Sequence, residues 1–218
     1  MMAWAPQFAT DAPRILCLGA HCDDIEIGCG GLLMQLARRY PKAVVHCVVF
    51  SSNPAREKET RAALGSLLKK VAVTEIEVLN FRNSYFPYIG AEIKDAFEGI
   101  RKAGSPDLVL THFREDRHQD HRTISDLSWN TFRDHSILEY EIPKYDGDLT
   151  QVNTYVPLAD DVVDEKVRTL MDCFPSQAGR QWFTEETFRS LLRLRGIECN
   201  APSGYAEGFV SRKTTITF

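Results

Sequence analysis

Short apolar runs alternate with amphipathic stretches between residues 14 and 132, and this alternation predicts an α/β fold. Apolar runs that end in polar or glycine-rich loops are typical of strands buried in a parallel sheet. They predict strands at Arg14–Ala20, Ala43–Phe50, Ile76–Leu79 and Asp107–Thr111. Helical spacing of apolar residues predicts helices at Gly30–Tyr40, Pro54–Lys70, Ala91–Ala103 and from His121 to about Phe132. Strands that alternate with helices form right-handed crossovers, so we expect a Rossmann-like, mostly parallel sheet flanked by helices.

The remainder of the chain is less regular. It predicts two more strands, at Leu138–Ile142 and Val152–Val156, and two more helices, at Asp160–Cys173 and Thr184–Arg195. No linker, low-complexity tract or internal repeat separates these elements from the earlier ones. We therefore expect one domain over residues 1–218.

Acidic and histidine side chains gather after two of the predicted strands. The first cluster, His21–Asp24, follows the first strand directly, and the second, Asp116–His121, comes just after the fourth. Ligands of such sheets bind beyond the carboxyl ends of the strands, so the loops after residues 20, 50 and 111 should face one crevice. The sequence thus predicts that both clusters meet at one site.

These residue types suit a divalent metal. A catalytic zinc typically has three protein ligands, often His and Asp, and keeps one position open for water. His21, Asp24 and His121 would supply such a set. Asp23 lies between two of these ligands in sequence and would be free to take a proton from the water as general base.

The later cluster predicts a second role. His118, oriented by Asp120, fits a residue that stabilises an oxyanion or protonates a leaving amine. Each cluster alone could be structural, because a single loop histidine or an isolated acidic pair more often is. Two clusters at neighbouring strand ends of one sheet favour the catalytic interpretation.

Both clusters resemble the signatures of one enzyme family. Residues 20–31 read AHCDDIEIGCGG, which resembles the AHPDD(E)xxxGxGG signature of the LmbE-like, or PIG-L, family of N-acetylglucosaminyl deacetylases. HQDH at residues 118–121 resembles the family's second signature, HxDH, and the resemblance spans at least residues 14–132. It implies a Rossmann-like fold and a zinc ion on His21, Asp24 and His121. It also implies Asp23 as general base and His118, with Asp120 behind it, as the group that acts on the oxyanion or the amine.

The chain departs from these signatures at two positions. Cys22 replaces the usual proline, and Ile25 replaces a frequent glutamate, with Glu26 one position later. Cys22 leaves open a thiolate contact or a redox-sensitive position near the metal. The glycines of residues 28–31 have GxGG spacing rather than GxGxxG, so we expect close backbone approach at a helix start rather than a dinucleotide site.

Several other polar residues are candidates for substrate contact. Arg56 resembles an arginine that in relatives holds a substrate hydroxyl or phosphate, although a solvated helix face explains it equally well. His112 lies near the predicted site but lacks a motif partner. A sugar pocket could further include Glu141, Lys144, Tyr145, Gln177, Arg180, Tyr205 and Glu207.

Composition narrows the class of protein. A net charge of -4 argues against nucleic-acid binding, which needs a surplus of basic residues on one face. No stretch approaches the roughly 20 apolar residues of a membrane-spanning helix, and the first 13 residues do not resemble a signal peptide, so we expect a cytoplasmic protein. Six cysteines without a CxxC pair argue against a structural zinc site. Homo-oligomer formation stays open.

The sequence therefore predicts a zinc-dependent hydrolase that removes the acetyl group from an N-acetylglucosamine-type amino sugar. The ligand types would also accept another divalent metal, such as iron or cobalt. Two alternatives remain: a metal-dependent amidase that acts on a non-sugar N-acyl compound, and a sugar-binding module without catalysis.

Overall fold

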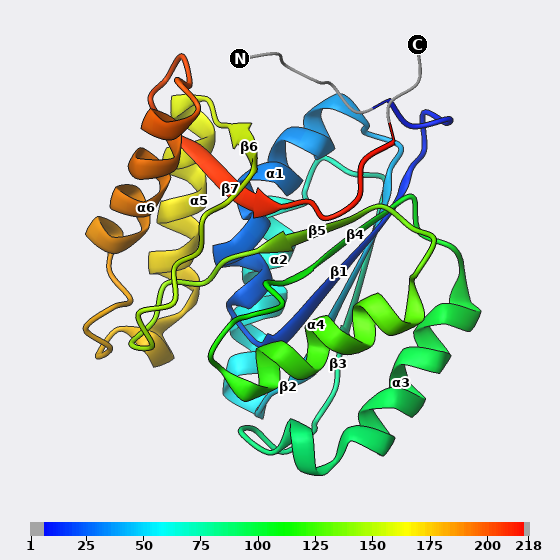
Figure 1. The fold of residues 1–218 in the computed structure, drawn as a ribbon. Coiled ribbons are helices and arrows are strands. Elements are labelled where there is room, and N and C mark those ends of the chain that lie inside the picture. The colour runs from blue at the N-terminus through cyan, green and yellow to red at the C-terminus, as the bar shows by residue number, and fades with distance from the viewer. Residues whose placement is uncertain (1–6, 216–218) are drawn as a thin grey trace.

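A sheet of seven strands runs through the molecule within residues 7–215, the part of the chain that the computed structural model describes (Figure 1). The strand order is β3-β2-β1-β4-β5-β7-β6. Neighbours among the first five strands pair in parallel, whereas β7 pairs antiparallel with both β5 and β6. The predicted α/β fold with a mostly parallel sheet is confirmed. The strands are β1 (Arg14–His21), β2 (Val44–Ser51), β3 (Val73–Val78), β4 (Leu108–His112), β5 (Ile137–Tyr140), β6 (Thr154–Pro157) and β7 (Ala206–Val210).

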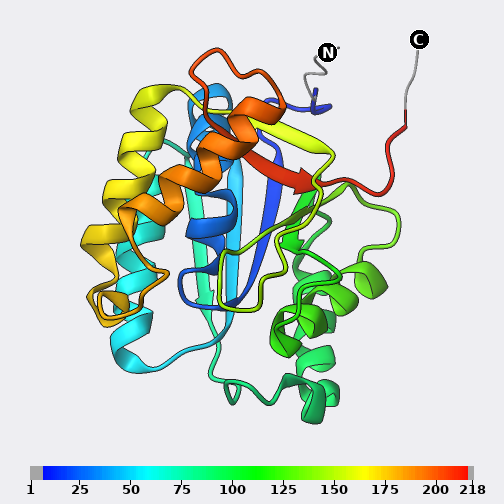
Figure 2. The same ribbon diagram turned by 60° about the vertical axis from the view of Figure 1, so that its left-hand side comes forward.

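Helices cover both faces of this sheet (Figure 2). Four lie on one face: α1 (Asp24–Arg39), α2 (Pro54–Leu67), α5 (Asp160–Cys173) and α6 (Glu185–Glu198). The other face carries α3 (Gly90–Ala103), α4 (Gln119–Thr131) and the short 3-10 helix η1 (Phe86–Tyr88). A second 3-10 helix, η2 (Pro175–Gln177), follows α5. None of the helices in the described part of the chain combines the length and apolar character that crossing a membrane requires.

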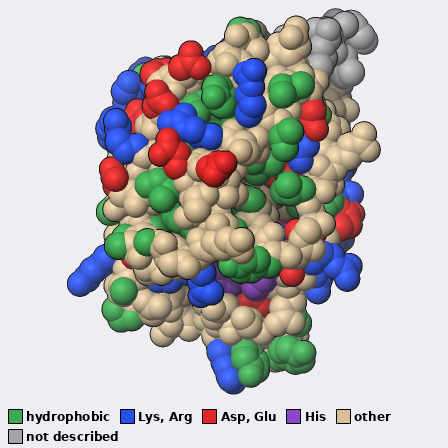
Figure 3. Space-filling model, turned by 90° about the vertical axis from the view of Figure 1, so that its left-hand side faces the viewer, with side chains coloured by type: hydrophobic (Ala, Val, Ile, Leu, Met, Phe, Trp, Pro, Cys, Tyr) green, Lys and Arg blue, Asp and Glu red, His purple; other side chains and the backbone are tan. Residues whose placement is uncertain are grey.

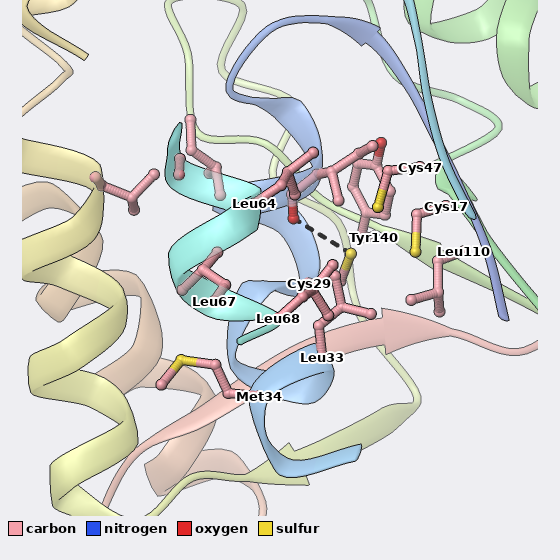
Figure 4. Close-up of a cluster of buried hydrophobic side chains, with 14 of the residues drawn as sticks. Cys17, Cys29, Leu33, Met34, Cys47, Leu64, Leu67, Leu68, Leu110 and Tyr140 are labelled. Atoms are coloured by element: carbon pink, nitrogen blue, oxygen red, sulfur yellow. Dashed lines mark hydrogen bonds between the residues drawn. The ribbon is translucent and has the colours of Figure 1, made fainter. Parts of the chain in front are cut away.

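Alternation along β1 divides the core into two halves. Ile15 and Cys17 pack against the layer of α1, α2, α5 and α6, while Leu16 and Leu18 pack against α3 and α4. This is the period of two that a strand buried on both faces must have. Cys17 belongs to a group of buried thiols with Cys29 and Cys47 (Figure 4). Burial raises the pKa of the Cys17 thiol, so it behaves as a small hydrophobic side chain.

Helix α1 begins six residues earlier than its apolar spacing predicts. It starts at Asp24 and is kinked at Cys29, where φ is -143° and ψ is 15°. The glycine-rich run hides the helical period because glycine contributes no side chain to it. A Cβ atom at Gly28 would overlap the ring of Tyr140, and one at Gly31 would overlap Leu158. Side chains therefore approach the backbone of these glycines closely, as predicted, but the glycines lie within α1 rather than at its start.

A buried ion pair completes the hydrogen bonds that this kink leaves open. In an unbroken helix the Gly31 amide would bond to the Ile27 carbonyl. Here the carboxylate of Glu207 accepts from the amides of Gly31 (2.6 Å) and Leu32 (2.7 Å). The ammonium group of Lys166 donates to the Ile27 carbonyl and to Glu207, both at 2.6 Å. Strand β7, which carries Glu207 and was not predicted from the sequence, thus fixes the helix that starts at the candidate site.

We expect Glu207→Ala to lower the free energy of unfolding by about 3–5 kcal/mol, because it leaves the Lys166 charge buried without a partner. Urea unfolding measures this change. The matched control is Glu57→Ala, which removes an exposed partner of Arg61 and should cost less than about 1 kcal/mol. Equal losses in the two variants would contradict a structural role for the buried pair.

Candidate metal centre

The two clusters predicted from the sequence meet at the carboxyl ends of β1 and β4, which are neighbours in the sheet. His21 ends β1, Asp24 opens α1, and His121 lies in the first turn of α4. His21 Nδ1 is 3.2 Å from His121 Nε2 and 3.5 Å from Asp24 Oδ2. His121 Nε2 is 3.5 Å from Asp24 Oδ1. The three side chains expected to act as ligands therefore lie next to one another.

These separations suit a small divalent cation. Ligand atoms about 2.0–2.1 Å from a tetrahedral zinc lie about 3.3 Å from one another. The tautomers agree, because His121 Nδ1–H donates to Asp116 Oδ2 at 3.0 Å and His21 Nε2–H donates to Asp120 Oδ2 at 3.2 Å. Each ring then directs its second nitrogen, with a lone pair, toward the other ring. Two lone pairs at this distance repel each other unless a cation or a proton lies between them.

The charges around the two imidazoles also favour a bound cation. Burial lowers the pKa of His121 to about 3, so its ring is neutral and able to bind a metal. Burial also disfavours the charged form of His21, but the Asp120 and Asp24 carboxylates outweigh it and raise the pKa of His21 to about 10. The negative charges that attract a proton to this place also attract a cation.

Among the described residues, two groups of side chains have ligand atoms close enough to share an ion, and each group contains two of the three expected ligands. The ligand atoms of His21, His118 and His121 lie within 4.8 Å of one another, and so do those of Asp24, His112 and His121. His112 is fully buried, with Nε2 3.2 Å from Asp24 Oδ2 and its ring stacked on His121 at 3.9 Å. The sequence offered no motif partner for His112, but its position at the end of β4 was a usable signal.

Asp23 stands beside the ligand set in an unusual backbone conformation. Its φ of 102° lies in the left-handed region, which costs a residue other than glycine about 1–3 kcal/mol and is often found at functional sites. Burial raises the pKa of Asp23 to about 7, against the opposing charge of Arg56. Arg56 Nη2 lies 2.8 Å from Asp23 Oδ2, and the same nitrogen donates to the Cys22 carbonyl. The arginine expected to hold substrate is thus placed against the expected general base.

The two departures from the family signature, Cys22 and Ile25, are both buried, and so is Glu26 next to Ile25. The Cys22 sulfur lies 3.2 Å from the Ser52 hydroxyl, and burial raises the pKa of Cys22 to about 12. The open option of a thiolate contact is therefore not supported. Glu26 is fully buried and accepts a hydrogen bond from Thr60, and burial raises the pKa of Glu26 to about 8.

The sequence led us to expect that the Asp120 carboxylate orients His118. In the structure it does not. Its Oδ2 contacts His21 and accepts from the amide of Ser84 (2.6 Å), and its Oδ1 accepts from the amide of Phe86 (3.2 Å). His118 is the N-cap of α4, and its Nδ1 accepts from the backbone amide of Asp120 at 3.2 Å. The Asp120 carboxylate therefore positions His21.

Asp116 takes the orienting role for the second imidazole, which the sequence analysis did not assign. Besides His121, it accepts from the amide of His118 (2.8 Å) and from Lys144 Nζ (3.0 Å). Burial alone would raise the pKa of Asp116, but the hydrogen bond with His121 and the surrounding positive charges hold it well below its usual value. Its place in the acidic and histidine cluster was the only sequence signal.

Three other candidates for a sugar pocket have structural partners. Glu141 pairs with Arg195 at 2.6 Å, Glu207 caps the kink in α1, and Lys144 holds Asp116. Tyr145 remains 68% exposed.

In Figure 3 the histidine side chains lie at the floor of a depression, with hydrophobic side chains above them and hydrophobic and basic side chains projecting below.

Comparison with known proteins places the same region in one family. The family described as PIG-L, GlcNAc-PI de-N-acetylase, matches residues 16–132, which are more than half of the chain and include both clusters. The uncharacterized deacetylase YaiS of Escherichia coli (strain K12) is 35% identical over 140 residues, which cover 59% of this chain and 74% of YaiS.

Solved structures share the fold. The N,N'-diacetylchitobiose deacetylase from Pyrococcus horikoshii has a TM-score of 0.68 at 22% identity, over 92% of this chain and 84% of that one. GalB, the 4-carboxy-2-hydroxymuconate hydratase from Pseudomonas putida KT2440, has a TM-score of 0.72 at 17% identity, over 94% and 98% of the two chains. Since this fold supports both a deacetylase and a hydratase, the reaction must be argued from the family and the site.

Proposed function

Because the chain belongs to the PIG-L family of de-N-acetylases, we propose that its substrate is an N-acetylglucosamine-type sugar and that His21, Asp24 and His121 hold a divalent cation, preferably zinc. The N-deacetylase activity follows from the family, whereas the metal and the sugar are our proposal. The observation that supports the metal most strongly is the meeting of two imidazoles and a carboxylate within 3.5 Å.

Each side chain around this point has a different proposed role in amide hydrolysis. A bound cation would lower the pKa of a water molecule toward about 7 and polarise the acetamido carbonyl. Asp23 would take the proton from the water as the water oxygen bonds to the carbonyl carbon. Arg56 keeps the Asp23 carboxylate in position through their ion pair. Asp116 and Asp120 hold the ring N–H groups of the two histidines.

His118 also lies beside the two imidazoles. Its ring lies 4.9 Å from that of His21 and 4.5 Å from that of His121, measured between centroids. From there it can donate a hydrogen bond to the developing oxyanion, or a proton to the amine nitrogen as the C–N bond breaks. The products are acetate and the free amino sugar.

The choice of sugar rests on the relatives. The family is described by a GlcNAc-containing substrate, and one structural neighbour is named for an acetylated disaccharide. We expect zinc-loaded protein to release acetate from N-acetylglucosamine or its glycosides, measured by an enzyme-coupled acetate assay. N-acetylated amino acids serve as non-sugar substrates of similar reactivity. Release from these alone would contradict the sugar and support a general amidase.

His118→Gln should lower kcat about a hundred- to a thousandfold, the usual loss when one donor to an oxyanion is removed. Its zinc content should match the wild type, because the proposed ligand set remains. The matched control is His135→Gln, since His135 lies after α4 and pairs with Ser105. Loss of zinc together with activity would instead make His118 a metal ligand.

A further inference from the structure

Two tyrosines project into solvent from the connection between β3 and α3. Tyr88 is 76% exposed and Tyr85 is 39% exposed, and their ring centroids are 5.9 Å apart. The guanidinium carbon of Arg82 lies 3.4 Å from the centroid of the Tyr85 ring. Exposed aromatic rings that lie close together beside a cation form a surface on which a ligand ring can stack.

This aromatic pair is tied directly to the metal centre. The amides of Ser84 and Phe86, on either side of Tyr85, both donate to the Asp120 carboxylate that contacts His21. Phe86 is fully buried, and its ring stacks with that of His21 at a centroid distance of 6.1 Å. Tyr85 is therefore the direct sequence neighbour of two residues that contact the site.

The segment is also held in one conformation. Ser84 has a φ of 66°, in the left-handed region. The hydrogen bonds from the Ser84 and Phe86 amides to Asp120 stabilise this turn. The side-chain amide of Gln119 donates to the Ser84 carbonyl as well. A surface that is already ordered loses little entropy when it binds a ligand. The tyrosine pair is thus prepared for binding.

The position of the tyrosine pair indicates which part of a substrate it would contact. The acetamido group must reach the ligand set at the floor of the depression, so the rest of the substrate extends toward the rim. The β3–α3 connection, which carries both tyrosines, lies at the lower end of the molecule in Figure 1, and its residues Ser84 and Phe86 contact Asp120 and His21. A sugar ring fits such a surface, because its C–H face packs on aromatic rings and its hydroxyls accept hydrogen bonds from a guanidinium group.

We propose that Tyr85 and Tyr88 bind a second sugar ring linked to the acetamido sugar, so that the preferred substrate is an N-acetylated disaccharide or longer glycan. This inference rests on the proposed function, since it assumes an amino-sugar substrate. It adds the specificity-determining residues and the chemistry of the group beyond the scissile amide.

The test compares kcat/KM for N-acetylglucosamine and for its β-1,4-linked disaccharide, N,N'-diacetylchitobiose, with zinc-loaded protein. We expect the wild type to favour the disaccharide by about tenfold, the factor that one good aromatic stacking contact of about 1.4 kcal/mol provides. Tyr88→Ala should lose most of this preference through kcat/KM for the disaccharide, with the monosaccharide unchanged. Tyr88→Phe should retain it, and Tyr145→Ala is the control for an exposed tyrosine on another loop.

Each other outcome has a distinct meaning. Turnover of both sugars with no preference, unchanged in Tyr88→Ala, overturns the inference and leaves the proposed function intact. Acetate release from neither sugar overturns the proposed function, and the inference falls with it. Light scattering on the same samples identifies a third case: a wild-type dimer that dissociates in Tyr88→Ala would make the pair a contact between copies of the chain and would overturn the sugar subsite.

Discussion

Replacement of Asp23 by asparagine is expected to lower kcat for acetate release by about a hundred- to ten-thousandfold, the range that general acid–base catalysis contributes. The amide has the shape of the carboxylate but cannot take a proton from water. Asp23 is 5% exposed, so bulk solvent is poorly placed to replace it with another base. Steady-state kinetics measures the loss, and zinc analysis of the same protein should give the wild-type content.

Asp126→Asn is the control for this variant, because Asp126 is exposed on α4. It should retain wild-type kcat and stability. Full turnover by Asp23→Asn would exclude Asp23 as the base and leave its left-handed backbone as a structural feature only.

Replacement of His121 by alanine is expected to raise the zinc dissociation constant by more than a hundredfold and to lower kcat by at least as much. His121 supplies Nε2 to the proposed ligand set, and removing a ligand should cost more than removing a group that only orients one. Asp116→Asn gives the comparison: an outer partner of a metal-bound histidine contributes about 10–100-fold in affinity or activity. Competition with a chromogenic chelator measures the zinc dissociation constants of the two variants.

The order of these effects is the diagnostic result. His121→Ala should be the more damaging change, with Asp116→Asn intermediate between it and the wild type. Zinc binding that is unchanged in His121→Ala would contradict the proposed set, even if activity is lost.

Local sequence was enough to predict that His21, Asp24 and His121 lie close together. His21 and Asp24 flank the turn that ends β1, and His121 follows β4, so their meeting depends only on these two strands being neighbours. A parallel α/β sheet makes such neighbours typical at the point where its chain order reverses. The spacing of a few side chains around a strand end is therefore readable without coordinates.

Contacts between distant segments were not readable. The Asp120 carboxylate binds the backbone amides of Ser84 and Phe86, and no side-chain pattern identifies two amides in an irregular segment. The early start of α1 was hidden for a related reason. Its kink is stabilised by Glu207, 176 residues away from Gly31, in a five-residue strand whose apolar run is interrupted by Glu207 and Gly208.

A zinc-loaded crystal measured at the zinc absorption edge tests the metal centre most directly. We predict one anomalous peak at about 2.0–2.1 Å from His21 Nδ1, His121 Nε2 and an Asp24 oxygen. A peak bound through His112 or His118 in place of one of these ligands, or no peak at this end of the sheet, would contradict the account.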